Sequence, residues 1–418
     1  MKPTSGALRY FCRIKNGATP ASVEPEYWDG NIKWATPEDL GKLMSNKIIN
    51  TKRLITEKAV EECNLSVLLE GAVIISTRAP IGHMAINESL MAFNQGCRGI
   101  IPGDQVHGPF LYYMLKSRTC ELNAIANGTT FVELSRDELA AVLVEFPPLD
   151  TQRRIAQFLD EKTARIDALI EKKHELLDRL AEKRQALITR AVTKGLDSDV
   201  PMKPSGVEWI GEIPRHWGTK RLKQISEIFT GYAFRSTDFV DSGIPVLRIG
   251  NIQFDGTISL QDAKFLPIYF KERYRNWLVQ NGDYAMAMTG ATVGKVGRVS
   301  NICFALLNQR VCIMRQNKNS TRDFLWLLLN SNPFRKFVEL EAFGGAQPNI
   351  SADKIGLCQI AIPEKSEQAE IILKISRPLA EIDKIEEKIQ LSIVHLQEYR
   401  SALVTAAVIG QIQELVEQ

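Results

Sequence analysis

A glycine-rich run with a lysine is the first stretch of this sequence whose residue types could do chemistry: residues 290–297 read GATVGKVG. Loops of this kind cradle nucleotide phosphates when four residues separate the first glycine from Gly-Lys and a serine or threonine follows for the metal ion. Here only three residues separate Gly290 from Gly294, and a valine follows Lys295. Apolar residues alternate on both sides of the run, which favours a strand, a turn and a second strand. We therefore interpret it as a structural turn and not as a nucleotide site.

A second candidate, FPPL at 146–149, is similar to the (N/D)PP(Y/F) motif with which methyltransferases hold a target amino group. It lacks the amide or carboxylate of that motif, and no glycine-rich cofactor loop follows a predicted strand upstream of it. Prolines that mark the junction between a domain and a helix are the better interpretation. The chain also has no GxSxG elbow, DEAD box or paired-carboxylate nuclease core. We therefore expect no catalysis by this chain itself.

The cysteines and histidines do not predict a metal site or a disulfide framework. Seven cysteines occur without a CxxC pair, and five histidines occur without an HExxH motif. Scattered cysteines in odd number are typical of reduced, mostly buried thiols in a cytosolic protein. No apolar run reaches membrane-spanning length and the N-terminus lacks a secretory signal, so we expect a cytoplasmic protein with no membrane contact. The net charge of +3 permits a nucleic-acid partner without requiring one.

An internal repeat organises the chain. Residues 146–192 align without a gap with residues 362–408, at an offset of 216 and with sixteen identities. Chance would give about two or three, so we infer a tandem duplication. The identities include Gln152/Gln368, Ile166-Asp167/Ile382-Asp383, Arg184/Arg400, Ala186-Leu187/Ala402-Leu403, Thr189/Thr405 and Ala191-Val192/Ala407-Val408. Weaker matches lie upstream: TRAPIG (77–82) with TGATVG (289–294), and Asn94-Gln95 with Asn308-Gln309. Each half thus consists of a divergent block followed by a better-matched one.

The better-matched block has the spacing of a long amphipathic helix with coiled-coil character. A helix over 162–193 would span about 48 Å at ~1.5 Å per residue. Pro378 predicts that a short first helix ends there in the second copy, and by symmetry a break near Lys162. The predicted apolar stripes are Ile155, Leu159, Ile166, Leu169, Leu176, Leu180 and Leu187, and Ile371, Ile375, Ile382, Ile385, Ile389, Leu396, Tyr399 and Leu403.

Opposite charge favours pairing of the two helical blocks with each other. Residues 151–195 carry a net charge of +4, and residues 367–418 carry a net charge of −4. A pseudo-twofold axis between the copies would make the pair antiparallel. The alternative is that each helix packs on its own domain with a solvated outer face. Between the halves, residues 196–223 form a linker whose Trp209 and Trp217 we expect to pin it to a neighbouring surface.

The divergent blocks mix β-rich segments such as LLEGAVIIST and IPVLRIGNI with helical ones such as GPFLYYMLKS and TRDFLWLLLNS. This mixture predicts an α+β protein: two α/β-type domains separated by two long helices that pair as an antiparallel coiled coil.

Three stretches then closely resemble the specificity subunit of type I restriction–modification systems: KPSGVEWIGEIPRHW, the whole helical segment LDTQRRIAQFLDEKTARIDALIEKKHELLDRLAEKRQALITRAVTKG, and TGATVGKVG. The resemblance covers nearly the whole chain, although a second KPSGVEWIGEIPRHW lead-in is missing before the first domain. It implies target-recognition domains at 1–146 and 219–361, helical spacer repeats at 147–196 and 362–418, and a linker at 197–218.

The resemblance also implies a non-catalytic subunit that reads double-stranded DNA with a bipartite target. Each recognition domain would read one half-site, and the helices would fix the unread spacer. A 48 Å helix matches about 14 base pairs at ~3.4 Å each. The implied partners are two methyltransferase subunits, which methylate adenine with S-adenosylmethionine, and ATP-driven, Mg-dependent restriction–translocation subunits. No cofactor is expected in this chain.

Base readout requires Arg, Lys, Asn and Gln on loops, and phosphate contacts require Lys, Arg, Ser, Thr and backbone amides. Because Asn94-Gln95 recurs as Asn308-Gln309, we expect this pair to support the fold more than to distinguish bases. The candidate DNA-binding residues are Lys33, Arg78, Asn94, Gln95, Thr129 and Thr130 in the first domain, and Arg235, Arg248, Asn251, Lys295, Arg298 and Gln347 in the second.

Three other functions remain as alternatives. A stand-alone DNA-binding regulator would need no methyltransferase partner. A methyltransferase or nuclease would require catalytic motifs that the sequence lacks. A coiled-coil scaffold would not need two large divergent domains.

Overall fold

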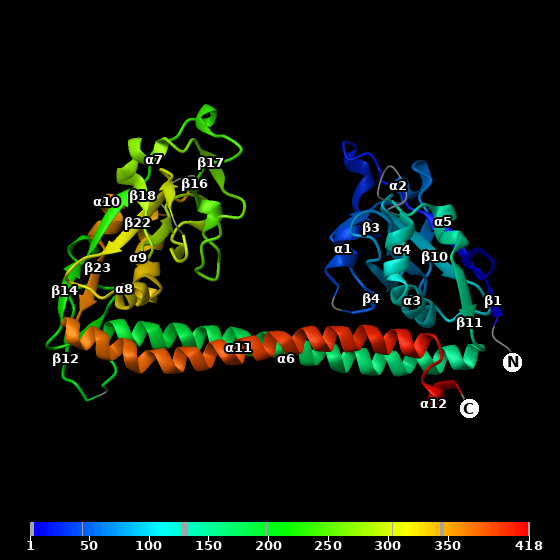
Figure 1. Cartoon of the computed structure of the whole chain (residues 1–418). Helices are drawn as coiled ribbons and strands as arrows, with labels where there is room; N and C mark the ends of the chain where they lie inside the picture. The colour runs from blue at the N-terminus through cyan, green and yellow to red at the C-terminus, as the bar shows by residue number, and fades with distance from the viewer. Residues whose placement is uncertain are drawn as a thin grey trace. The chain divides into compact units, whose positions relative to one another are not determined.

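Two mixed α/β domains and two long helices make up the computed structural model, which describes residues 4–43, 45–126, 133–197, 199–302, 304–342 and 347–416 (Figure 1). The chain divides into unit 1, formed by Met1–Glu175 and Ile389–Gln418, and unit 2, formed by Leu176–Lys388. Each unit contains one domain together with part of the helices α6 (Leu149–Thr193) and α11 (Lys365–Val408).

The domain of unit 1 is built on two sheets. A five-stranded sheet has the order β2-β10-β7-β8-β4, a four-stranded sheet has the order β5-β3-β9-β6, and β1 pairs with β11. The strands are β1 (Thr4–Ala7), β2 (Cys12–Asn16), β3 (Trp28–Ala35), β4 (Lys47–Ile48), β5 (Arg53–Ile55), β6 (Val67–Leu68), β7 (Val73–Ser76), β8 (Met84–Asn87), β9 (Met91–Phe93), β10 (Cys97–Pro102) and β11 (Leu143–Phe146). The helices are α1 (Pro37–Gly41), α2 (Glu57–Glu62), α3 (Gly108–Ser117), α4 (Thr119–Ala126) and α5 (Arg136–Ala141).

The domain of unit 2 repeats this strand order, except that β4 has no counterpart among its described strands. Its two four-stranded sheets run β15-β22-β19-β20 and β17-β16-β21-β18, and β14 pairs with β23. The corresponding four-stranded sheets each contain one parallel pair, β3 with β9 and β16 with β21, and the five-stranded sheet of unit 1 contains another, β4 with β8. The strands are β14 (Gly218–Arg221), β15 (Ser226–Thr230), β16 (Ile244–Leu247), β17 (Lys264–Leu266), β18 (Leu278–Val279), β19 (Tyr284–Ala287), β20 (Val296–Arg298), β21 (Ala305–Leu307), β22 (Val311–Gln316) and β23 (Gln359–Ile362). The helices are α7 (Phe270–Arg273), α8 (Arg322–Leu329), α9 (Asn332–Ala342) and α10 (Ala352–Leu357).

A fully buried central strand lies between two hydrophobic clusters in each domain. In β7, Val73 and Ile75 pack with α3, whereas Ile74 faces a second cluster around Phe93. In β19, alternate residues starting from Tyr284 belong to one cluster and the residues between them to another. Such strands are continuous apolar runs because successive side chains point to opposite faces and both faces are covered.

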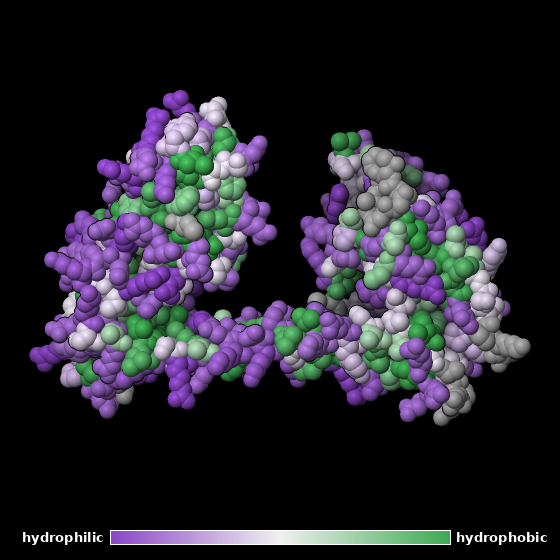
Figure 2. Space-filling model, in the orientation of Figure 1, coloured by the Kyte–Doolittle hydropathy of each residue, from purple (hydrophilic) through white to green (hydrophobic). Residues whose placement is uncertain are grey.

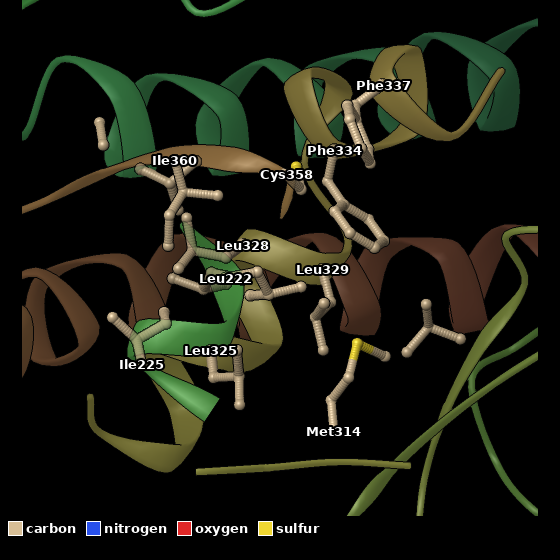
Figure 3. Packing of buried hydrophobic residues seen from close by; sticks show 14 of the residues in the cluster. Leu222, Ile225, Met314, Leu325, Leu328, Leu329, Phe334, Phe337, Cys358 and Ile360 are labelled. Carbon is tan, nitrogen blue, oxygen red and sulfur yellow. The ribbon is translucent and has the colours of Figure 1, made fainter. Parts of the chain in front are cut away.

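The larger hydrophobic core of unit 2 contains residues of its domain and of both long helices. Leu325, Leu328 and Leu329 of α8 gather with Phe334 and Phe337 of α9 between the two helices (Figure 3). The same cluster contains Ile188, Ala191 and Val192 of α6 and Ile371 and Ile375 of α11.

The long helices are continuous, so the predicted breaks at Pro378 and near Lys162 are wrong. Pro378 lies inside α11, which runs for 44 residues, and α6 runs for 45 residues through Lys162. A proline removes one backbone hydrogen bond and crowds the preceding turn. Here Ile375 and Ile382 remain buried on either side of it, so packing holds the helix together across the lost bond.

The predicted apolar stripes are correct from Ile155 to Ile166 and from Ile371 to Ile382, and they depart from the buried face further along each helix. At the C-terminal ends Leu187 and Leu403 are only partly buried, and their neighbours Ile188 and Val404 are the buried residues. On α6 the buried residue is Ile170 and not Leu169, which is 45% exposed. On α11 Ile385 and Tyr399 are exposed, whereas Ile393 is buried. A straight helix has 3.6 residues per turn, so a strict 3.5-residue pattern drifts away from the packed face. The visible surface of the helices is accordingly hydrophilic with hydrophobic interruptions (Figure 2).

An ion pair joins the two helices within each unit. In unit 2, Arg184 of α6 contacts Asp383 and, at 3.0 Å, Glu386 of α11. In unit 1, Arg400 of α11 contacts Asp167 of α6 with N–O distances of 2.9 and 3.1 Å.

The linker tryptophans pack against unit 2 and hold the linker there, as expected. The linker contains the paired strands β12 (Met202–Pro204) and β13 (Glu212–Pro214). Trp217 is buried and donates from Nε1 to the Glu367 carboxylate at 2.9 Å. Trp209 packs on Phe337 with ring centroids 5.5 Å apart. In unit 1, the C-terminal helix α12 (Gln413–Val416) follows α11, and its Leu415 carbonyl accepts a hydrogen bond from Arg154 at 3.2 Å.

Candidate nucleic-acid interface

The GATVGKVG run is a hairpin turn, as its alternation predicts. β19 and β20 pair antiparallel on either side of it, so no long helix follows to cradle a phosphate. Gly294 has a φ of +84°, and a Cβ there would lie 3.0 Å from Val338, so the turn requires glycine. The hairpin between β7 and β8 has Gly82 at a φ of +90° in the same place. The glycines therefore serve the turn.

Lys295 projects from this turn toward Phe254. Its Nζ lies 4.3 Å from the centre of the Phe254 ring, a cation–π distance. Both residues line a cleft of about 660 Å³ that is also lined by Asp255, Asp383 and Glu386. Charges of both signs meet there, so this cleft is less suited to a phosphate than a purely basic one.

A more basic cleft lies among the loops of the same domain. It has a volume of about 680 Å³, and its charged lining residues are Arg248, Lys264 and Arg310, which we call the basic cleft. Phe234 and Phe239 line it as well. The described salt bridges of this domain join other residues, namely Arg298 to Asp323, Arg315 to Asp283 and Lys354 to Glu341. The three cations of the basic cleft are thus available to an external anion.

Arg310 also lines an adjoining cleft of about 550 Å³. Its other polar lining residues include Thr289, Gln347 and Asn349. Thr289 and Asn349 form an antiparallel β-bridge there, and the Gly290 N–H donates to the Pro348 carbonyl at 2.9 Å. The two clefts together offer cations to phosphates and amide side chains to base edges.

Two side-chain amides, buried Asn251 and half-buried Asn308, hold the loops that carry these cations. Asn251 accepts from the Arg248 N–H at 2.9 Å and donates to the Ser259 carbonyl at 3.0 Å. Asn308 accepts from the Arg310 N–H at 3.2 Å. Both asparagines thus position the backbone of a cleft arginine, which is a loop-building role of the Asx-turn kind.

An aromatic cluster stiffens the wall behind the basic cleft. Tyr232 lies 4.7 Å from Tyr274 and 5.2 Å from both Phe234 and Trp277, measured between ring centroids. Tilted and edge-on rings at such distances attract one another. The Phe234 side of the cleft is therefore preorganised.

The first domain has a different polar surface around the corresponding bridge. Arg78 forms a β-bridge with Glu133, and its Nε contacts the Glu133 carboxylate at 3.0 Å. Arg98 contacts the same carboxylate at 3.2 Å. A single carboxylate thus holds two cations here, where the second domain has Asn349 and no such pair among its described residues.

The remaining candidates of the first domain serve the fold or stand exposed. Asn94 accepts from the Gly96 N–H at 2.7 Å and donates to the Thr19 hydroxyl at 2.9 Å. Lys33 donates to the Ser89 hydroxyl at 3.0 Å, and Gln95 is exposed. Thr129 and Thr130 lie outside the described residues. The turn built by Asn94 repeats the turn built by Asn308, whereas the glutamine of the second pair, Gln309, lines the basic cleft.

The structure brings together only some candidates of the second domain. Arg248 lines the basic cleft and Gln347 lines the adjoining cleft, whereas Lys295 lines the cleft of mixed charge. Asn251 is buried, and Arg235 is exposed at the start of a short 3-10 turn. Arg298 contacts Asp323 at 3.0 Å.

Sequence reasoning missed Lys264 and Arg310. Arg310 directly follows Asn308-Gln309, at the place where Gly96 follows Asn94-Gln95. A change of residue type directly after a repeated pair was a usable signal. Lys264 has no such signal, because only the pairing of β17 with β16 brings it opposite Val246 and into the cleft.

No helix in the described part of the chain is both long and apolar enough to cross a membrane. Over the same residues, no three His, Cys, Asp or Glu side chains gather as a metal site would require.

Comparison with known proteins gives consistent relatives. The type I restriction–modification specificity subunits MjaIX and MjaVIII of Methanocaldococcus jannaschii are 29% and 26% identical to this chain, over 96% and 86% of it and over 91% and 81% of their own lengths. The EcoKI specificity subunit of Escherichia coli is 22% identical over 86% of this chain and 77% of its own length.

Solved structures share the fold. A chain from a study of complex assembly and conformational transition of the type I R-M system matches with a TM-score of 0.72, at 15% identity and 97% coverage of both chains. The HsdS subunit of Thermoanaerobacter tengcongensis matches with a TM-score of 0.50, at 16% identity, over 98% of this chain and 97% of its own. The family model of the type I restriction modification DNA specificity domain matches twice, over residues 6–179 and 214–394, so the chain belongs to that family.

Proposed function

We propose that this chain is the DNA-reading specificity subunit of a type I restriction–modification enzyme. Each domain reads one half of a bipartite target in double-stranded DNA. The observation that carries the proposal is that one strand order occurs twice with different polar residues on its loops. A common scaffold with exchanged loop residues is what two readers of unlike half-sites require.

The basic cleft is the proposed DNA-contact region of the second domain. Arg248 and Lys264 suit phosphate contacts, because a cation without a carboxylate partner gains most from a phosphate. Arg310 lines both clefts, and Gln347 lines the adjoining one. Arginine can form two hydrogen bonds with the edge of a guanine, and glutamine can form two with the edge of an adenine. The candidates Arg235, Lys295 and Arg298 are assigned to the flanks of this region.

The first domain reads its half-site with a different set of groups. Arg78 and Arg98 share Glu133, whose carboxylate would repel a phosphate but can accept a hydrogen bond from a cytosine or adenine amino group. The remaining proposed contacts, Lys33, Gln95, Thr129 and Thr130, come from the sequence alone, and Asn94 is assigned to the turn that it builds.

The helices pair as an antiparallel coiled coil related by a pseudo-twofold axis. The offset of 216 that aligns the two halves converts Arg184 into Arg400 and Asp383 into Asp167. The same ion pair therefore occurs once in each unit with the roles of α6 and α11 exchanged. Moving forward along α6 from 167 to 184 corresponds to moving backward along α11 from 400 to 383, which supports the antiparallel direction.

This pairing supports the assignment of recognition domains to 1–146 and 219–361, helical spacers to 147–196 and 362–418, and a linker to 197–218. α6 alone is about 68 Å long at ~1.5 Å per residue. The helices fix the unread spacer and provide the docking surface for two methyltransferase subunits.

The chemistry of the enzyme belongs to partner subunits. Methyltransferase subunits bring S-adenosylmethionine, and restriction–translocation subunits bring ATP and Mg²⁺. This chain is non-catalytic and binds none of these cofactors itself. Because its ligand is DNA, we place it in the cytoplasm.

Methylome sequencing of the host with and without the gene tests the proposal. We expect a two-part methylated adenine motif to disappear when the gene is deleted. An unchanged methylome, combined with purification of the chain as a stable protein that binds DNA without methyltransferase subunits, would instead identify a stand-alone DNA-binding regulator.

A further inference from the structure

Gln152 occupies an unusual place in the first turn of α6. Its side chain is fully buried, although glutamine is a mostly exposed residue type. The side-chain oxygen accepts from the His107 N–H at 2.8 Å. The side-chain nitrogen donates to the Gln105 carbonyl at 2.9 Å and to the Pro147 carbonyl at 2.8 Å. Both amide hydrogens and one lone pair are therefore used.

Gln368 makes the same three contacts in the first turn of α11. It is also fully buried. Its oxygen accepts from the Thr321 N–H at 2.8 Å, and its nitrogen donates to the Asn319 carbonyl at 3.3 Å and the Pro363 carbonyl at 3.1 Å. The two glutamines thus bind a backbone carbonyl and the N–H two residues later, plus a proline carbonyl just before the long helix.

The bonded segment is the start of the most buried helix of each domain. His107 is the N-cap residue of α3, and Thr321 is the N-cap residue of α8. These helices carry central core residues such as Phe110 and Phe324. Each glutamine therefore fixes the core helix of a recognition domain directly to the long helix beneath it.

Every atom that the glutamines bind is a backbone atom. The side chains at the bonded positions differ between the domains, Gln105 and His107 in one and Asn319 and Thr321 in the other. A joint of this kind tolerates any domain residue except proline at the donating position, because only proline lacks the N–H. The domains could diverge while the joint stayed the same.

We propose that Gln152 and Gln368 are positioning residues that set the angle of each recognition domain on the helices, independently of the sequence of the domain. This inference rests on the proposed function for its consequence, which is the spacing between the half-sites. A domain held at one angle accepts one spacer length, and a domain free to tilt accepts neighbouring lengths as well.

The test uses the full chain assembled with its methyltransferase subunits and duplexes whose half-sites are separated by the native spacer or by one base pair more or less. Gln152→Glu and Gln368→Glu keep the shape but cannot donate to the carbonyls. Gln368→Asn keeps the amide but is one methylene too short, and it serves if the glutamate variant does not fold. Gln157→Glu and Gln390→Glu, at exposed positions of the same helices, are the matched controls.

We expect the Gln152 and Gln368 variants to discriminate about tenfold less between duplexes with the native spacer and duplexes with altered spacers. This is the scale expected when one buried hydrogen-bonding group is removed. The half-site sequences should remain those of the wild type, and the controls should behave as wild type. A variant that only loses thermal stability while still rejecting altered spacers would overturn the inference, because the glutamine would then be an ordinary core residue.

Hydrogen exchange of the chain alone separates this inference from the proposed function. In Gln368→Asn the amide of Thr321 should exchange faster while that of His107 stays protected, and Gln152→Asn should do the reverse. Unchanged protection of these two amides would overturn the inference even if the enzyme still methylates its target. If the wild-type complex methylates no bipartite target, the proposed function fails. The exchange data alone then decide whether the two glutamines hold the domains on the long helices.

Discussion

At the scale of single residues, the second domain differs from the first in how its cations are held. Arg78 and Arg98 share the Glu133 carboxylate, whereas Arg248, Lys264 and Arg310 face open clefts. A cation that already has a carboxylate partner gains less from DNA than one that has none. Substitutions in the second domain should therefore have the larger effects on DNA binding.

Arg310 gives the sharpest residue-level prediction. Arg310→Ala should relax recognition at one base pair of one half-site by about 1–3 kcal/mol and leave the other half-site unchanged. Binding of the assembled enzyme to duplexes substituted at each position measures this. Lys318→Ala, which removes an exposed charge of the same domain outside the clefts, is the control. A uniform loss over all duplexes would make Arg310 a phosphate contact.

Lys295 tests the glycine-rich turn. Lys295→Ala should weaken DNA binding for all sequences and reduce the slope of log K against log salt by about 0.9, the value for one phosphate contact. A salt titration of binding measures the slope. If affinity and slope stay the same, the contact with Phe254 is structural and the turn has no part in DNA binding.

Buried cysteines predict how the folded chain reacts with thiol reagents. Burial raises the pKa of Cys12, Cys97 and Cys312 to about 12 each. Because the thiolate is the reactive form, these thiols should stay unmodified between pH 7 and 9, while exposed Cys120 is alkylated. Mass spectrometry after alkylation measures this, and denaturant should expose all sites. Rapid labelling of Cys97 in the native protein would contradict the described core.

Sequence reasoning reached the recurring residues better than the unique ones. Asn94 and Asn308 were expected to support the fold because they recur, and both build the same turn. Lys264 was missed because its position depends on a strand pairing between distant segments. Recurrence reveals shared structure, whereas contacts specific to one domain leave no such trace in a single sequence.

At the scale of elements, the ion pair between α6 and α11 should stabilise unit 1 measurably. Arg400→Asp should lower the free energy of unfolding by about 1 kcal/mol, since both partners are partly buried and lose their attraction. The reciprocal double variant Arg400→Asp with Asp167→Arg should recover most of that loss. A double-mutant cycle in denaturant measures the coupling. Lys172→Asp, at an exposed position of α6 within unit 1, is the matched control. An absent coupling would remove this pair as support for the coiled coil.

Helix identity was predictable, but helix continuity and the buried face were not. The apolar spacing and the lack of glycine identified α6 and α11. Pro378 was expected to end a helix because proline removes a backbone hydrogen bond, and this loss is the only effect that the local sequence reveals. Packing on both sides of Pro378 outweighs that loss, and it is visible only in the folded chain.

At the scale of the whole molecule, the recognition domains should be exchangeable. Replacing residues 219–361 by the corresponding domain of another family member should change one half of the methylated motif and leave the other half intact. Methylome sequencing of a host with the chimera measures both halves. The reciprocal exchange of residues 1–146 is the control and should alter the opposite half. A chimera in which both halves change would show that the domains do not read independently.

The proposed organisation into two divergent blocks and two matched blocks rests on the repeat, because sixteen identities at one offset are far more than unrelated segments of that length would share. The order of strands within each domain could not be predicted from this repeat. Sheets such as β15-β22-β19-β20 place neighbours far apart in sequence, and strands of two to eight residues carry weak patterns.

The division of the chain has a consequence for its synthesis on the ribosome. Unit 2 is one continuous segment, Leu176–Lys388, so its core residues have all been made once Lys388 has been added. Unit 1 also needs Ile389–Gln418, whose Val404 and Ala407 pack with Ile155 and Leu159. The domain made first is therefore completed last, and its core beneath α3 waits for the translation of everything between.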